Sequence, residues 1–174
     1  MYKITFKSQL FIVKELLGRA TVLVIGLFLF VVIFLHGQEA GFIVKVSAPF
    51  YLLFELLPCI IIHYQYFKSN KDTIVSVNTV DRTMSIDEKG TLNSFRFDQI
   101  KSLRLALMAD LYNGRNGGFG AYLLYHYAYI ELYNGDNFII TCLIYNDLRK
   151  FFENIKIEVV RDLVFFPIDL PPKR

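Results

Sequence analysis

Two long apolar runs near the N-terminus constrain this chain more than any other feature of its sequence. Residues 20–35 (ATVLVIGLFLFVVIFL) carry no charged side chain, and residues 42–67 carry only Lys45 and Glu55. Hydrophobic residues make up 54% of the 174-residue chain, above the ~45–50% of an ordinary globular domain. Runs of this kind are typical of membrane spans, which need about 20 apolar residues each. We therefore expect residues 18–67 to form a transmembrane hairpin of two helices.

The flanks of the two runs are basic, and the connection between them is not. The flanking cations are Lys3, Lys7, Lys14, Arg19, Lys68 and Lys71. The connection holds Glu39 and neither Lys nor Arg. Cytoplasmic loops of membrane proteins carry the excess of Lys and Arg, so this pattern predicts that both termini lie in the cytoplasm and that the lipid bilayer is a partner.

The predicted spans contain polar residues that need an explanation. Glu55 would be a carboxylate inside the membrane, and such groups are costly and often functional. Three interpretations stay open: an ion or proton site, an ion pair with Arg19 on the facing helix, or a contact with another subunit. Pro49 and Pro58 should kink or locally break the second helix, because proline removes a backbone donor.

The segments on either side of the hairpin have different patterns. Residues 1–17 alternate apolar and basic side chains, which fits either an interfacial amphipathic helix or a frayed cytoplasmic tail. Residues 72–166 change to short alternating runs separated by turn residues, which predicts a cytoplasmic β domain. We expect residues 167–174, which end in Pro-Pro-Lys-Arg, to be disordered.

Within the β domain, alternation predicts strands over residues 73–78, 82–87, 92–97, 100–108, 122–133 and 138–144. Turn sequences separate them, and Asn134-Gly135 is the clearest hairpin signal. The period then changes, because Leu148, Phe151, Phe152 and Ile155 recur at helical spacing after Asn146, a plausible N-cap. This helix should cover the open end of the sheet. Residues 156–166 fit either a last strand or an extended tail.

This order of elements resembles a known family. The stretches IVSVNTVDRTMSI, SFRFDQIKSL, YAYIELYNGDNFIIT and NDLRKFF are similar to those of bacterial membrane proteins with a pleckstrin-homology-like (PH-like) domain. The resemblance implies a partial β barrel with one C-terminal helix, placed at the bacterial inner membrane. It implies binding of proteins or lipids and no enzyme active site. Residues 78–82 of the first hairpin carry one base and one acid, so we expect no specific phosphoinositide binding.

The most informative pattern within the β domain is a row of tyrosines. Alternate residues of a strand share one face, which groups Tyr125, Tyr127, Tyr129 and Tyr133. Aromatic residues are enriched at protein interfaces, so the row predicts a binding surface. The competing interpretation is a structural row, formed by a cross-strand ladder or covered by the chain after Ile155.

The loop before the tyrosines is rich in glycine. Residues 114–120 (GRNGGFG) lack the Gly-Lys-Ser/Thr and the following helix of a phosphate-binding loop. We interpret this segment as a hairpin loop, in which Arg115 and Phe119 extend the predicted binding surface.

Composition excludes several other classes of function. A net charge of +3 without a basic stripe argues against nucleic-acid binding. Cys59, Cys142 and the three histidines show no metal-ligand or triad spacing, so we expect no cofactor, no metal and no catalysis. We interpret both cysteines as small buried hydrophobes and His126 as a core histidine.

Two functional hypotheses remain from the sequence. In the first, the chain is a membrane-anchored, non-catalytic scaffold whose PH-like domain binds a protein partner, a membrane surface or a second copy. In the second, it is a subunit of a transport or ion-coupled complex that uses Glu55.

Overall fold

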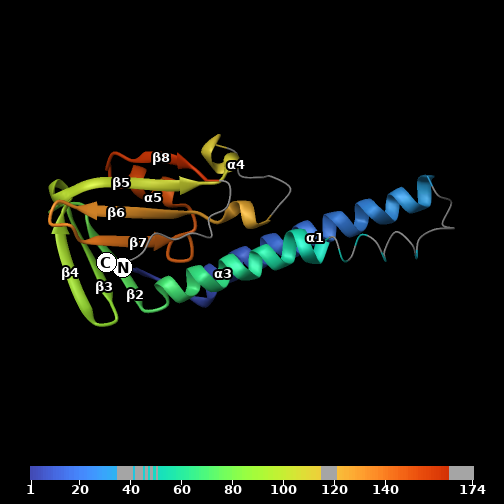
Figure 1. The fold of residues 1–174 in the computed structure, drawn as a ribbon, viewed down its shortest axis with the longest axis horizontal. Coiled ribbons are helices and arrows are strands. Elements are labelled where there is room, and N and C mark those ends of the chain that lie inside the picture. The colour runs from blue at the N-terminus through green and yellow to red at the C-terminus, as the bar shows by residue number, and fades with distance from the viewer. Residues whose placement is uncertain are drawn as a thin grey trace.

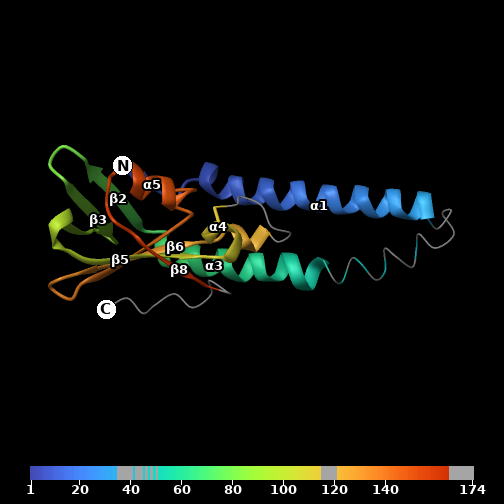
Figure 2. The same ribbon diagram turned by 90° about the horizontal axis from the view of Figure 1, so that it is seen from above.

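The computed structural model describes residues 1–34, 41, 45, 47, 49, 51–114 and 121–164. Two β sheets and a short helix lie at one end of the molecule. Two longer helices, α1 (Phe6–Phe34) and α3 (Leu57–Asn70), extend away from the sheets in the same direction (Figures 1 and 2).

The first sheet has the strand order β1-β2-β3-β4, with every neighbouring pair antiparallel. Its strands are β1 (Tyr2–Lys3), β2 (Thr73–Asn78), β3 (Thr83–Glu88) and β4 (Thr91–Arg96). Val75, Met84 and Ile86 are buried because alternate residues of β2 and β3 point into the core. The N-terminal residues therefore belong to the β domain: Tyr2 pairs with Val75 before α1 begins.

The second sheet has the order β7-β6-β5-β8. Its strands are β5 (Ile100–Leu107), β6 (Tyr127–Leu132), β7 (Asn137–Thr141) and β8 (Val160–Leu163). β5 and β8 run parallel, whereas the β5–β6 and β6–β7 pairs are antiparallel. A single turn of 3₁₀ helix, η2 (Phe97–Gln99), carries the chain from the first sheet to the second.

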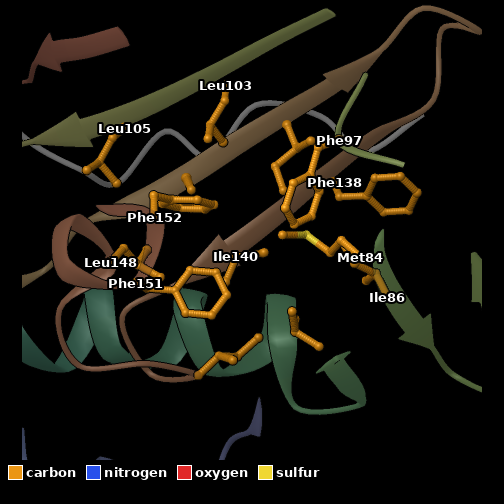
Figure 3. Close-up of a cluster of buried hydrophobic side chains, with 14 of the residues drawn as sticks. Met84, Ile86, Phe97, Leu103, Leu105, Phe138, Ile140, Leu148, Phe151 and Phe152 are labelled. Carbon is orange, nitrogen blue, oxygen red and sulfur yellow. The ribbon is translucent and has the colours of Figure 1, made fainter. Parts of the chain in front are cut away.

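Helix α5 (Leu148–Asn154) closes the core between the two sheets, as its spacing predicts. Leu148, Phe151 and Phe152 are buried among strand residues from both sheets (Figure 3). The N-cap is Asp147 rather than Asn146, and its carboxylate accepts hydrogen bonds from the backbone N–H groups of Arg149 and Lys150. The prediction of a mainly β, PH-like domain with one C-terminal helix is confirmed.

The prediction of a transmembrane hairpin is wrong. Within the described ranges, the structure contains no helix with both the length and the apolar composition to cross a membrane. Helix α3 has 14 residues, which span about 21 Å against a hydrocarbon core of about 30 Å. Some apolar residues of the second predicted span instead pack against the β domain, among them Ile62 and Tyr66 of α3.

The predicted localisation depended on those two spans and is therefore also wrong. Placement in the inner membrane, with both termini cytoplasmic and the bilayer as an integral partner, required a membrane-spanning hairpin, and no helix of the described residues could form one.

Pro58 does interrupt the second helical region, as expected. Ahead of α3, residues Leu52–Leu56 form a turn of π helix, η1, in which the N–H of Leu57 bonds to the carbonyl of Leu52. Proline lacks an N–H and its ring clashes with the carbonyl four residues earlier, which accounts for a widened turn at this point.

Candidate functional site: the outer face of the second sheet

The predicted tyrosine row divides between the interior and the surface. The strand expected over residues 122–133 is shorter: a 3₁₀ turn, η3 (Ala121–Leu124), precedes it, and β6 begins only at Tyr127. Tyr125 is 1% exposed and lies in a buried cluster, whereas Tyr133 is 72% exposed in the β6–β7 turn. Tyr127 and Tyr129 lie between these extremes, each half-buried.

Tyr127 and Tyr129 point outward because the other face of β6 forms the core. Ala128, Ile130 and Leu132 are buried between the sheets, and the side chains that alternate with them face away. The strand register places Tyr129 between Arg104 of β5 and Ile139 of β7.

Helix α3 covers the β7 side of this outer face. Asn70, at the end of α3, is 0% exposed and bonds two backbone groups of β7. Its Nδ2 donates to the carbonyl of Ile139 at 2.8 Å, and its Oδ1 accepts from the N–H of Thr141 at 2.9 Å. Tyr66 of α3 meets Tyr127 edge to face, with 6.3 Å between the ring centroids. The side chain of Asn70 thus forms the two hydrogen bonds with the outer edge of β7 that a neighbouring strand would form.

The β5 side of the outer face is open and charged. Glu131 accepts hydrogen bonds from Lys101 Nζ at 2.7 Å and from Ser102 Oγ at 3.1 Å. The Lys101 hydrogen bond, followed by that of Ser102, lowers the pKa of Glu131. Arg104 is exposed directly across from Tyr129. We refer to Lys101, Arg104, Tyr127, Tyr129 and Glu131 as the outer-face patch.

Tyr125 joins α3 to the β domain and is not on the surface. Its hydroxyl lies 3.0 Å from His63 Nδ1 and donates to the carbonyl of Cys59 at 3.4 Å. Burial is the main cause that raises the pKa of Tyr125, and burial also lowers the pKa of His63. We leave Tyr125 out of the proposed binding surface for this reason.

Both cysteines are buried, as the interpretation of small hydrophobes predicts. Cys59 and Cys142 lie in the same cluster as Tyr66 and Tyr125. Burial raises the pKa of the Cys142 thiol to about 12, so the thiol stays protonated at neutral pH. A protonated, buried thiol is a poor nucleophile and a poor metal ligand.

His126 is a core histidine with both ring nitrogens engaged. Its Nε2 accepts a hydrogen bond from the N–H of Leu148 at 3.1 Å, so the proton of the neutral ring is assigned to Nδ1. Nδ1–H then donates to the carbonyl of Leu124 at 2.7 Å. Burial, as the largest cause, lowers the pKa of His126 to about 4.

His126 completes the cap of α5. The first N–H groups of a helix have no partner within the helix and must be satisfied from outside. His126 accepts a hydrogen bond from the N–H of Leu148, and Asp147 accepts hydrogen bonds from the N–H groups of Arg149 and Lys150. Asp147 keeps a lowered pKa because its contacts with Arg149, together with smaller contributions, outweigh the opposing effect of burial.

The remaining predicted site residues are not brought together in the described part of the chain. Arg115 and Phe119 lie outside the described residues. Glu55 is half-buried in η1, and Arg19 lies in α1 with a side chain outside the description, so their ion pair stays a prediction. Among the described residues, no group of three His, Cys, Asp or Glu side chains could hold a metal ion.

Two sheets closed by a C-terminal helix form the architecture of a PH-like domain. The family model described as PH domain matches residues 1–151, and the chain belongs to this family. The resemblance to bacterial membrane proteins is not supported beyond the PH-like domain itself. No curated protein and no solved structure matches the chain. PH domains are generally non-catalytic modules that bind proteins or lipids.

Sequence reasoning missed the charged partners of the tyrosines and the role of Asn70. Arg104 alternates with Leu103 and Leu105, so its outward direction could be deduced from the strand pattern. Its position opposite Tyr129 could not, because strand register depends on the bulge between Ile100 and Ser102. The residues near Asn70 in the sequence do not indicate its role, because its partners lie far along the chain. Ile139 is 69 positions later and Thr141 is 71 positions later.

Proposed function

We propose that this chain is a non-catalytic interaction module that binds a protein partner through the outer-face patch. The observation that carries the proposal is the pair of half-exposed tyrosines beside Arg104 and the Lys101–Glu131 ion pair. Tyrosine offers a large apolar ring with few rotors and a hydroxyl that can find a new partner. A tyrosine flanked by arginine is the composition that energetically important interface positions favour.

The charges of the domain favour a protein over a phosphorylated lipid headgroup. Recognition of phosphate groups needs several converging cations. In the β2–β3 hairpin, the carboxylate of Asp81 accepts from Asn78 Nδ2 at 2.6 Å, which places an acid in the turn. Arg82 lies over the ring of Phe97, with its guanidinium carbon 5.9 Å from the centroid. A hairpin with one acid and one engaged base offers little to a phosphate.

The alternative function, an ion-coupled transport subunit based on Glu55, is not carried forward. This function required Glu55 to lie within a membrane span, and no helix of the described residues is long and apolar enough to be one.

Site-specific photo-cross-linking tests the proposal in the native cell. A benzoylphenylalanine at position 129 should give a discrete cross-linked protein adduct that the additional change Arg104→Glu abolishes. The matched control is the same cross-linker at Leu92, which is 66% exposed on β4 of the other sheet. Adducts from position 129 that contain only lipid, or that match those from position 92, would show that the patch is not a protein contact.

A further inference from the structure

The strand β8 differs from the rest of the domain in three respects. It pairs in parallel with β5, whereas every other strand pair that the structure describes is antiparallel. Among the described strands longer than two residues, it is the only one without a buried residue, and Val160 and Leu163 are 56% and 47% exposed. The match to the PH domain family ends at residue 151, before β8 begins. β8 thus lies outside the part of the chain that matches the family model.

The end of α5 separates the core of the domain from β8. Lys156 has a φ of 53°, in the left-handed region that non-glycine residues seldom adopt. The N–H of Lys156 bonds to the carbonyl of Glu153, and that of Ile157 bonds back to Phe152. Ile157 and Val159 still pack on the core, so the domain is closed up to the residue before β8.

Without β8, the outer edge of β5 would present unpaired backbone groups. The described part of the chain places no other strand on that side, because the sheet order is β7-β6-β5-β8. An unpaired strand edge is a template for pairing with another chain. Adding an extended segment to such an edge is a recurrent way for domains to bind protein partners.

We propose that the β5 edge is a docking site for an extended segment of a protein partner, and that β8 occupies this edge until the partner displaces it. The proposal rests on the proposed function and adds to it a binding mode and a regulation. The edge borders the outer-face patch, since Arg104 pairs with both Tyr129 and Val160. A segment in place of β8 would therefore lie directly beside the patch.

The weak packing of β8 lowers the free energy needed to displace it from β5. Parallel pairing is slightly less stable per residue than antiparallel pairing. Exposed side chains add little hydrophobic stabilisation, because this stabilisation grows with the apolar area removed from water. The strand is held chiefly through backbone contacts such as the Val164 N–H to the Leu107 carbonyl, at 2.9 Å. Such segments open locally without unfolding of the whole domain.

Hydrogen exchange on the full chain gives the first measurement. The amide of Val164 should exchange at least about tenfold faster than the amides shared between β5 and β6, because β8 opens by itself. Exchange of all these amides at one common rate would mean that β8 opens only with the whole domain, and would overturn the proposal.

A peptide in trans gives the second measurement. The probe is a synthetic peptide with the sequence of residues 157–164, IEVVRDLV. In the full chain, Asp162→Pro with Val164→Pro removes amides on the side that bonds β5, since amide direction alternates along a strand. This variant should bind the peptide about tenfold more tightly than the unaltered chain, because β8 no longer competes for the edge.

The control changes the neighbouring pair. Arg161→Pro with Leu163→Pro removes amides that point away from β5, where proline is tolerated on an edge strand. The control should bind the peptide like the unaltered chain. Equal peptide affinity in both proline variants, or no binding to either, would overturn the edge proposal. Either result would leave the cross-linking test of the patch unaffected, so the two proposals can fail separately.

Discussion

Replacing Asn70 with leucine should lower the free energy of unfolding by about 2–6 kcal/mol. The change leaves the carbonyl of Ile139 and the N–H of Thr141 without their hydrogen bonds in a buried place. Each buried, unsatisfied backbone group costs about 1–3 kcal/mol. Leucine has the same number and branching of side-chain heavy atoms as asparagine but can neither donate nor accept a hydrogen bond, so the loss includes both missing hydrogen bonds. Chemical denaturation of the two proteins measures the difference.

Two further variants make this result specific. Asn70→Asp keeps an acceptor for Thr141 but loses the donor to Ile139, so its loss should also be large. Asn93→Leu, on the half-exposed part of β4, should stay within about 0.5 kcal/mol of the unaltered protein. Equal stability of the Asn70→Leu and Asn93→Leu proteins would mean that α3 does not pair the edge of β7.

Lowering the pH from 7.5 to 4 should remove about 3 kcal/mol of stability through His126 alone. The pKa of this residue falls from 6.5 to about 4 on folding, chiefly because burial disfavours the charged ring. Between those values the unfolded chain binds the proton more readily than the folded chain. Stability from neutral His126 is therefore complete above pH 6.5 and is lost as the pH falls toward 4, at about 1.4 kcal/mol per pH unit.

The structural reason is that a protonated His126 cannot accept the N–H of Leu148. His126→Gln supplies a non-titrating acceptor at the same position, so this variant should lose about 3 kcal/mol less than the unaltered protein over the same pH range. Denaturant titrations at both pH values measure the two losses, and the comparison cancels the contributions of Asp147 and other acids. Parallel pH dependence of the two proteins would contradict this role of His126.

The strands and the capping helix could be predicted because their signals are local. Alternation in β2 and β3 places Met84 and Ile86 inside, and helical spacing places Phe151 and Phe152 on one buried face. The strand from residue 122 was predicted too long because Tyr125 continues the alternation of Tyr127 and Tyr129. The chain leaves the strand at that point, since the Tyr125 side chain packs with α3.

The prediction of membrane spans failed for a different physical reason. Apolar composition shows that a segment avoids water and does not show which apolar surface it meets. Ile62 and Tyr66 of the second apolar run pack in one cluster with Tyr125 of the β domain, so protein covers these two side chains. The role of Asn70 and the hydrogen bond from Leu148 to His126 were not predicted, because the partners lie far apart in the sequence and only the folded chain brings them together.

The central claim is that the outer-face patch binds a partner and does not merely stabilise the sheet. The most direct test makes two measurements on the Tyr129→Ser variant and on the unaltered protein. The first is the melting temperature. The second is the yield of protein adduct from benzoylphenylalanine placed at position 133, which is 72% exposed beside the patch. We expect the melting temperature to fall by only a few degrees while the cross-link is lost, since Tyr129 is half-buried on the outer face. A large drop in melting temperature with the cross-link retained would contradict the account and make Tyr129 a structural residue.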